Sequence, residues 1–145
     1  MPMAETSKTP LLETRELKKY FKVKKSFLHA VDNINLKIDA GNTLGVVGES
    51  GCGKSTLGRT ILRLLEPTSG QVLFNGEDIT KLSKQQMKHK RRDMQIIFQD
   101  PYASINPRLS VSSIIAEPMI VNKMYPNKQE LHKRVRELMD TVGLA

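Results

Sequence analysis

The chain of 145 residues contains little cysteine, few aromatic residues and no long apolar run. Its one cysteine excludes an intrachain disulfide framework and a metal site built from several cysteines. No apolar run approaches the ~20 residues that are needed to span a bilayer. The first residues lack the apolar segment of a secretory signal. These absences favour a protein of the cytoplasm.

Acidic residues are also in the minority, since 15 Asp and Glu stand against 23 Lys and Arg, which gives a net charge of +8. The basic residues cluster in residues 18–25 and 88–92, and such clusters favour anionic partners. Nucleic-acid binding would gain support from interleaved aromatic residues, but none falls between Lys81 and Arg92. We therefore interpret the clusters as solvated surface and expect no nucleic-acid partner.

A glycine-rich loop with the pattern G-x-x-x-x-G-K-S is the most informative segment that is present. Its glycines let the backbone turn its N–H groups toward phosphate oxygens. Its lysine can reach the β- and γ-phosphates of a nucleotide, and the hydroxyl after the lysine can hold Mg²⁺. The loop residues are Gly48, Glu49, Ser50, Gly51, Cys52, Gly53, Lys54, Ser55 and Thr56.

The segments on both sides of the loop supply the context that this motif requires. Residues 43–47 are nearly all apolar, which is typical of a parallel strand buried on both faces. The apolar residues after the loop recur at helical spacing, at Leu57, Ile61, Leu64 and Leu65. Strand, loop and helix together predict a phosphate-binding site at a helix N-terminus.

Further strands are predicted at residues 11–17, 30–38, 71–74 and 94–98. The pair Asn75-Gly76 predicts a tight turn after the third of these. Residues 18–28 form a basic segment with three aromatic residues, to which we assign no element.

Three helices are predicted from their capping residues. Ser83, with Gln86 three positions later, resembles a capping box, and Ser110 is placed to cap a short helix that reaches Glu117. Asn127 opens a last helix, with Gly143 in the position typical of a C-terminal glycine. The apolar stripe of this helix is Leu131, Val135, Leu138, Met139 and Val142.

The loop and the later segment Phe98-Gln99-Asp100-Pro101 together resemble an ATP-binding cassette (ABC) ATPase. Residues 60–70 and 98–107 are similar to the ATP-binding subunits of bacterial oligopeptide and dipeptide importers. The resemblance implies an α/β P-loop NTPase fold, with a RecA-like core and a small antiparallel β subdomain. It also divides the chain into a flexible tail, residues 1–10, and the N-terminal portion of one nucleotide-binding domain, residues 11–145.

The fold is expected to be incomplete in these residues, because the family's signature sequence, second acidic strand and switch histidine have no match in them. We therefore expect residues 1–145 alone to bind ATP without turning it over. The same resemblance places additional strands between the loop strand and the strand before Gln99.

The resemblance assigns roles to particular residues. Tyr20 corresponds to an aromatic residue that stacks on adenine, Phe27 competes for this role, and Val31 flanks the base. Lys54 and Gln99 are the candidate catalytic residues. Ser55 and Gln99 are the candidate Mg²⁺ ligands, for which hydroxyl and amide oxygens are suitable. The expected cofactors are thus ATP and Mg²⁺.

The function implied by the resemblance is that of an importer ATPase, which couples ATP hydrolysis to the uptake of peptides or related solutes. Its expected partners are membrane-spanning permease subunits, a second ATP-binding subunit in a homo- or heterodimer, and, indirectly, an extracytoplasmic solute-binding protein. The expected location is the cytoplasmic face of the membrane, as a peripheral protein. The alternative is a soluble ABC-type or other P-loop NTPase that acts on nucleic acid or the ribosome.

Overall fold

The computed structural model describes residues 9–100 and 104–144. These residues form two compact units, Met1–Gln95 and Ile96–Ala145, and each unit is described by itself. Most of the predicted tail, residues 1–8, lies outside the described residues.

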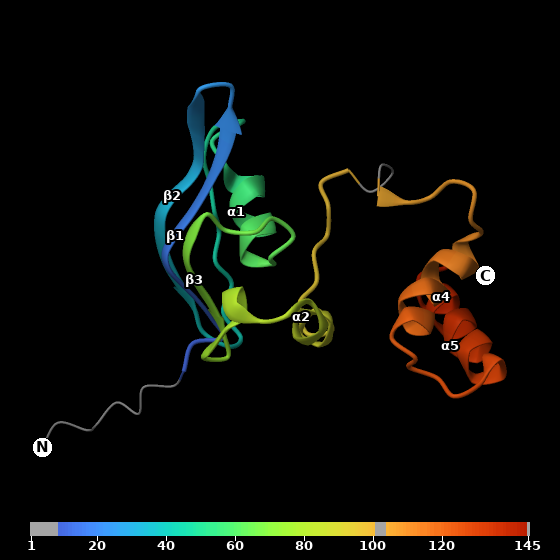
Figure 1. Cartoon of the computed structure of the whole chain (residues 1–145). Helices are drawn as coiled ribbons and strands as arrows, with labels where there is room; N and C mark the ends of the chain where they lie inside the picture. The colour runs from blue at the N-terminus through green and yellow to red at the C-terminus, as the bar shows by residue number, and fades with distance from the viewer. Residues whose placement is uncertain (1–8, 101–103, 145) are drawn as a thin grey trace, which may run out of the picture. The chain divides into compact units, whose positions relative to one another are not determined.

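A four-stranded antiparallel sheet, with strand order β2-β1-β3-β4, forms the first unit (Figure 1). The strands are β1 (Leu12–Val23), β2 (Ser26–Ile38), β3 (Ser69–Phe74) and β4 (Glu77–Asp78). Both long strands extend beyond their predicted bounds. Residues 18–28, for which no element was predicted, form the outer part of the β1–β2 hairpin. This part is held by backbone pairing and is largely exposed, so it lacks the apolar alternation from which strands are predicted.

The predicted tight turn between β3 and β4 is confirmed. Asn75 and Gly76 both have positive φ angles, of 50° and 80°. Such angles at both central positions match the twist of a two-residue hairpin, and Asn-Gly tolerates them best.

Helix α1 (Lys54–Ile61) packs against β1 and β2 and closes the core of the first unit. Helix α2 (Lys84–Lys90) follows a 3-10 turn, η1 (Ile79–Lys81). Its predicted capping box is confirmed, because Ser83 and Gln86 exchange side-chain and backbone hydrogen bonds. The buried core consists of Leu17, Val31, Leu57, Val72, Phe74, Ile79 and Met87.

Two predicted strands, residues 43–47 and 94–98, are wrong for this structure. Both segments are irregular, and Val47 and Ile97 are 93% and 97% exposed. A buried parallel strand needs neighbouring strands that accept and donate its backbone hydrogen bonds. No strand among the described residues pairs with either segment. The additional strands expected between the two segments stay a prediction.

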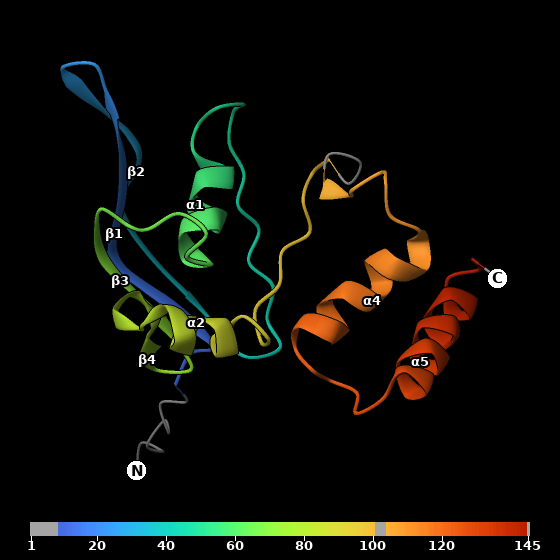
Figure 2. The same ribbon diagram turned by 45° about the vertical axis from the view of Figure 1, so that its right-hand side comes forward.

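Two helices, α4 (Val111–Val121) and α5 (Lys128–Thr141), lie side by side in the second unit (Figures 1 and 2). The predicted caps Ser110 and Asn127 are confirmed, and α4 runs four residues beyond its predicted end at Glu117. The buried residues between the helices are Ala116, Leu131 and Val135. Val142, which was predicted in the apolar stripe, follows the end of α5 and is 65% exposed.

Gly70 of β3 lies beside an irregularity in β1, and its backbone conformation leads to a prediction about stability. A Cβ atom added to Gly70 would lie 2.4 Å from the Glu16 carbonyl oxygen, and the φ of Gly70 is +87°. Gly41 has a similar φ, +82°, but open space around it. We expect Gly41→Ala to lower the free energy of unfolding by about 1 kcal/mol, through backbone strain alone. Gly70→Ala should cost about 3 kcal/mol or more, because the β3–β1 pairing must also move.

The measurement is urea unfolding of both variants beside the wild type. Equal losses of unfolding free energy for Gly70→Ala and Gly41→Ala would show that β3 and β1 move to accept the added Cβ atom at no cost beyond the backbone strain.

Candidate phosphate-binding site

The glycine-rich loop is attached to the sheet at Gly53. This residue has a φ of +97°, and a Cβ atom added to it would lie 2.1 Å from the Ala30 carbonyl oxygen. Only glycine satisfies both conditions, because any side chain would collide with the backbone of β2. Gly53 also precedes the first residue of α1. The loop therefore holds the N-terminus of α1 against the edge of β2.

Lys54 turns its ammonium group back over the loop. Its Nζ donates hydrogen bonds to the carbonyl oxygens of Gly48 at 2.7 Å and Glu49 at 2.6 Å, and it lies 3.4 Å from Cys52 Sγ. A lysine ammonium has three donors, so the loop itself satisfies all of them. A Cβ atom on Gly48 would lie 2.8 Å from Cys52 Sγ and 4.0 Å from Lys54 Nζ, so a side chain there would fill the cradle.

The N-terminus of α1 is suited to an anion. No side chain caps it, and its first turn contains no acidic residue. The first N–H groups of a helix have no acceptor within the helix and carry the positive end of its dipole. A phosphate group in the loop would therefore meet hydrogen-bond donors and positive charge from the loop backbone, from the Lys54 ammonium and from this helix end.

Ser55 fits the chemistry of a Mg²⁺ ligand in the first turn of α1. The residue is exposed, and no hydrogen bond engages its hydroxyl among the described residues. A hydroxyl oxygen is a suitable hard ligand, and Mg²⁺ usually completes its shell with phosphate oxygens and water. The other predicted ligand, Gln99, lies exposed at a bend in the second unit. Of the segment that follows it, residues 101–103 lie outside the described residues.

Tyr20 lies on the β1–β2 hairpin with two partners that the sequence did not reveal. Its ring stacks on the His29 ring, with centroids 3.8 Å apart and planes at 10°. Its hydroxyl donates a hydrogen bond to Asp32 Oδ1 at 2.5 Å. His29 and Asp32 were missed because residues 18–28 were not predicted as strand, so the cross-strand pairing was unknown. The only available signal was the presence of aromatic residues on both sides of the short segment Lys24-Lys25.

The hydrogen bond between Tyr20 and Asp32 changes both acidities. It holds the pKa of Asp32 below its ordinary value, with help from the nearby charges of Lys18 and His29. The same bond raises the pKa of Tyr20. Asp32 is therefore ionised at neutral pH, and the stability contributed by this contact is lost only as the pH falls through the lowered pKa of the carboxyl group.

The two other candidates for the base site differ in exposure. Phe27 lies near the turn of the hairpin, pairs with Lys22 across the strands and is 61% exposed. Val31 is 4% exposed and packs in the core of the first unit. Val31 thus packs on the core side of β2. Its predicted role beside the base stays a prediction.

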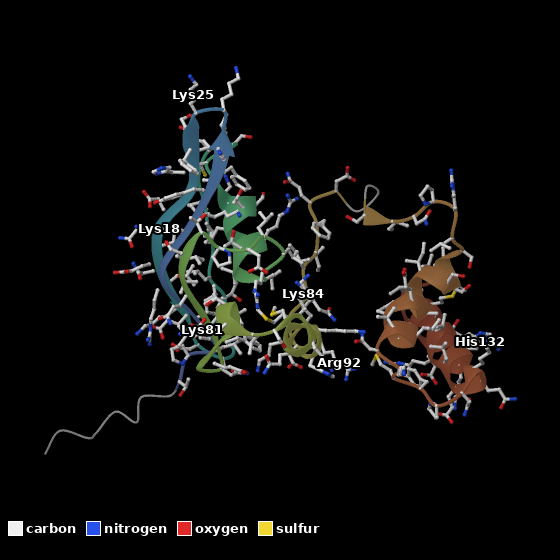
Figure 3. All side chains as sticks on the ribbon, viewed as in Figure 1. Lys18, Lys25, Lys81, Lys84, Arg92 and His132 are labelled. Carbon is white, nitrogen blue, oxygen red and sulfur yellow. The ribbon has the colours of Figure 1, made fainter. Side chains whose placement is uncertain are left out.

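Two residues of the basic cluster at 88–92, and Lys81 before it, have partners within the first unit. Lys81 pairs with Asp78 at 3.2 Å, and Lys90 pairs with Glu77 at 2.6 Å. Arg91 donates a hydrogen bond to the Arg63 carbonyl oxygen at 3.0 Å. Figure 3 labels Lys81, Lys84 and Arg92 in this region. The interpretation of the cluster as solvated surface without a nucleic-acid partner stays a prediction.

Comparisons with known proteins agree on one family. The family model described as ABC transporter matches residues 31–145. The oligopeptide transport ATP-binding protein OppF of Bacillus subtilis (strain 168) is 51% identical over 135 residues, which cover 92% of this chain and 44% of that protein. AppF of the same organism, also an oligopeptide transport ATP-binding protein, is 45% identical over 98% of this chain and 45% of its own length. The chain therefore spans less than half the length of these curated relatives.

A solved structure shows the same fold. A dimeric post-hydrolysis state of the ATP-binding cassette MJ0796, bound to ADP and Pi, matches with a TM-score of 0.75 and 27% identity. The match covers 89% of this chain and 56% of that one. No helix among residues 9–100 and 104–144 is both long and apolar enough to cross a membrane. The predicted fold class is confirmed by this likeness, and the chain belongs to the ABC transporter family.

Proposed function

We propose that this chain forms the ATP-holding part of an ATP-binding subunit that couples ATP hydrolysis to the import of peptides or related solutes. The observation that carries the proposal is the loop in which Lys54 and an uncapped helix N-terminus converge on one cradle. Two relatives named as oligopeptide transport ATP-binding proteins, at 45–51% identity, support the peptide as the transported class.

ATP binding in this proposal is an exchange of partners. The ammonium of Lys54 leaves the carbonyl oxygens of Gly48 and Glu49 for the β- and γ-phosphate oxygens. Ser55 and Gln99 would hold Mg²⁺, which neutralises charge on those oxygens when it is bound. The base would lie near Tyr20 and Val31. The phosphates would lie on Gly48, Glu49, Ser50, Gly51, Cys52, Gly53, Lys54, Ser55 and Thr56.

Hydrolysis also needs a group that orients the attacking water and further donors on the γ-phosphate. Gln99 is our candidate for a residue close to that water. The signature sequence of a second ATP-binding subunit, in a homo- or heterodimer, would supply donors from across the interface. The complete subunit would bind membrane-spanning permease subunits at the cytoplasmic face of the membrane, with a solute-binding protein on the other side.

A soluble NTPase that acts on nucleic acid is less well supported. In the basic cluster at 88–92, which would supply the basic surface, Lys90 and Arg91 already have partners in their own unit. Binding to nucleic acid would be strongly weakened by salt, because Lys and Arg displace counterions from phosphates. Retention on DNA that falls steeply with salt would favour this alternative over the importer.

Lys54→Ala tests the phosphate site directly. The variant removes the only cation that the loop presents to the β- and γ-phosphates, so the affinity of the full-length protein for ATP should fall on the order of 100-fold or more. Lys84→Ala, on exposed α2, is the matched control and should bind ATP as the wild type does. Calorimetric titration measures both, beside melting curves that check the fold. Wild-type affinity in a folded Lys54→Ala variant would refute the site.

Gln99→Ala tests the link between nucleotide and transport. Gln99 precedes the segment 100–107, which we propose faces the permease, so its contact with Mg²⁺ would report nucleotide state to that segment. We expect the variant to bind ATP within about twofold of wild type, since binding rests on the loop. The number of solute molecules moved per ATP hydrolysed should fall in reconstituted vesicles. Gln129→Ala, exposed near the start of α5, is the control. An unchanged ratio together with a lower melting temperature would mean that Gln99 only stabilises its own loop.

A further inference from the structure

The outer end of the β1–β2 hairpin, residues 22–28, exposes several apolar side chains, and we call it the hairpin tip. Strand β3 pairs with β1 only as far as Lys18, so beyond this point the hairpin is a ribbon of two strands (Figure 1). Phe27 and Leu28 are 61% and 57% exposed, and Val23 is 47% exposed. None of these three side chains belongs to the buried core of the first unit.

The strand register distributes the apolar side chains of the hairpin tip over both faces of the ribbon. Phe27 pairs with Lys22, and Val23 pairs with Ser26. Paired residues share a face, and neighbours along a strand alternate between the faces. Phe27 therefore lies on one face, and Val23 and Leu28 lie on the other. A partner that covered a single face would leave apolar side chains of the opposite face in water.

Positive charge surrounds these apolar side chains without a balancing carboxylate. Residues 17–31 contain five lysines and neither aspartate nor glutamate. Among the described residues, the ammonium groups of Lys22, Lys24 and Lys25 have no hydrogen-bond or ion-pair partner. Figure 3 labels Lys25 at the end of the hairpin. The hairpin tip thus carries three unpaired cations beside its exposed apolar side chains.

Protection of a free strand edge accounts for the lysines but not for the apolar side chains. Lysine on an edge strand prevents pairing with other chains, and β2 is the outermost strand of its sheet. Such protection needs no exposed aromatic or aliphatic side chain. The basic cluster at 88–92 shows the contrast, because it contains no apolar residue. The combination at the hairpin tip indicates a partner that is both anionic and apolar.

We propose that the hairpin tip docks onto the surface of an anionic lipid bilayer. Its apolar side chains insert at the boundary between headgroups and acyl chains, which surrounds the ribbon and covers both of its faces. Its lysines lie at the level of the lipid phosphates, where the negative surface potential attracts each of them. Pairing between the strands satisfies most backbone groups of the ribbon, so its insertion leaves few of them without a partner.

This contact needs neither a permease subunit nor a nucleotide, so it does not depend on the function proposed above. For the basic residues 18–25, it takes the place of the solvated surface that was predicted from the sequence. The exposed apolar side chains beside them are a finding of the structure.

The proposal is tested with the full-length protein and lipid vesicles, without permease subunits. One set of vesicles contains phosphatidylcholine alone, and the other also contains the anionic lipid phosphatidylglycerol. Sedimentation measures the fraction of protein that is bound. We expect the protein to bind the anionic vesicles and to bind them more weakly as salt is added. The neutral vesicles should bind much less protein, because they lack the negative surface potential.

A triple variant tests the charge of the hairpin tip. Lys22→Gln, Lys24→Gln and Lys25→Gln together should weaken binding to the anionic vesicles on the order of 100-fold, at about fivefold for each lysine. The matched control removes three positive charges from exposed positions on α2 and α5, and it should bind within about twofold of wild type. This control consists of Lys84→Gln, Lys88→Gln and Lys133→Gln.

A double variant tests insertion separately from charge. Val23→Ser with Leu28→Ser keeps every lysine and removes apolar surface from one face of the hairpin tip. We expect it to bind the anionic vesicles about tenfold more weakly than wild type. Both positions are exposed, so the variant should fold, and melting curves of all variants check this.

Four results would overturn the proposal. The wild type would fail to bind anionic vesicles, or the triple variant and its matched control would lose binding equally, which would assign the attraction to net charge. Wild-type binding by a folded Val23→Ser, Leu28→Ser variant would show that nothing inserts. Binding to double-stranded DNA that the triple variant abolishes, without binding of the wild type to vesicles, would identify the hairpin tip as a nucleic-acid surface.

Discussion

The close approach of Gly53 to the Ala30 carbonyl oxygen is the contact on which the arrangement of the first unit depends. It brings the glycine-rich loop to the edge of β2, because no side chain stands between the two backbones. Helix α1 begins at the next residue and packs its Leu57 into the core beside Val31. The same contact places the loop next to His29 and the hairpin. The absence of a Cβ atom at Gly53 thus lets the phosphate cradle, the core and the hairpin that carries Tyr20 lie together in one unit.

A bound phosphate would replace contacts that the Lys54 ammonium already makes within the loop. The three donors of the Lys54 ammonium are engaged by two loop carbonyl oxygens and by the sulfur atom of Cys52. Carbonyl dipoles are weaker partners for an ammonium than a charged phosphate oxygen, so the exchange favours binding. The uncapped N-terminus of α1 adds a positive dipole without any competing carboxylate in its first turn. In the proposed site, selectivity for a polyanion would therefore come from backbone geometry and one side chain.

The sequence predicted best those features whose cause is local. Ser83, Ser110 and Asn127 cap helices where they were expected, and Asn75-Gly76 forms its turn, because each depends on a few neighbouring residues. Residues 43–47 and 94–98 were predicted as strands from composition alone. A strand needs partners for its backbone groups, and the described residues provide none. Apolar composition shows that a segment is suited to a buried sheet but does not supply the sheet.

In the candidate site, too, the local motif was predicted from the sequence and the cross-strand contacts were not. The sequence by itself predicted the phosphate loop, since its glycines, Lys54 and Ser55 stand at the spacing of that motif. Of the elements that the motif implies, the helix after the loop forms and the strand before it does not. The sequence also pointed to an aromatic residue for the base. The tertiary structure alone decided that Tyr20 is covered by His29 and anchored by Asp32. Those contacts join residues 9 and 12 positions apart through the register of two paired strands, which local sequence patterns do not encode.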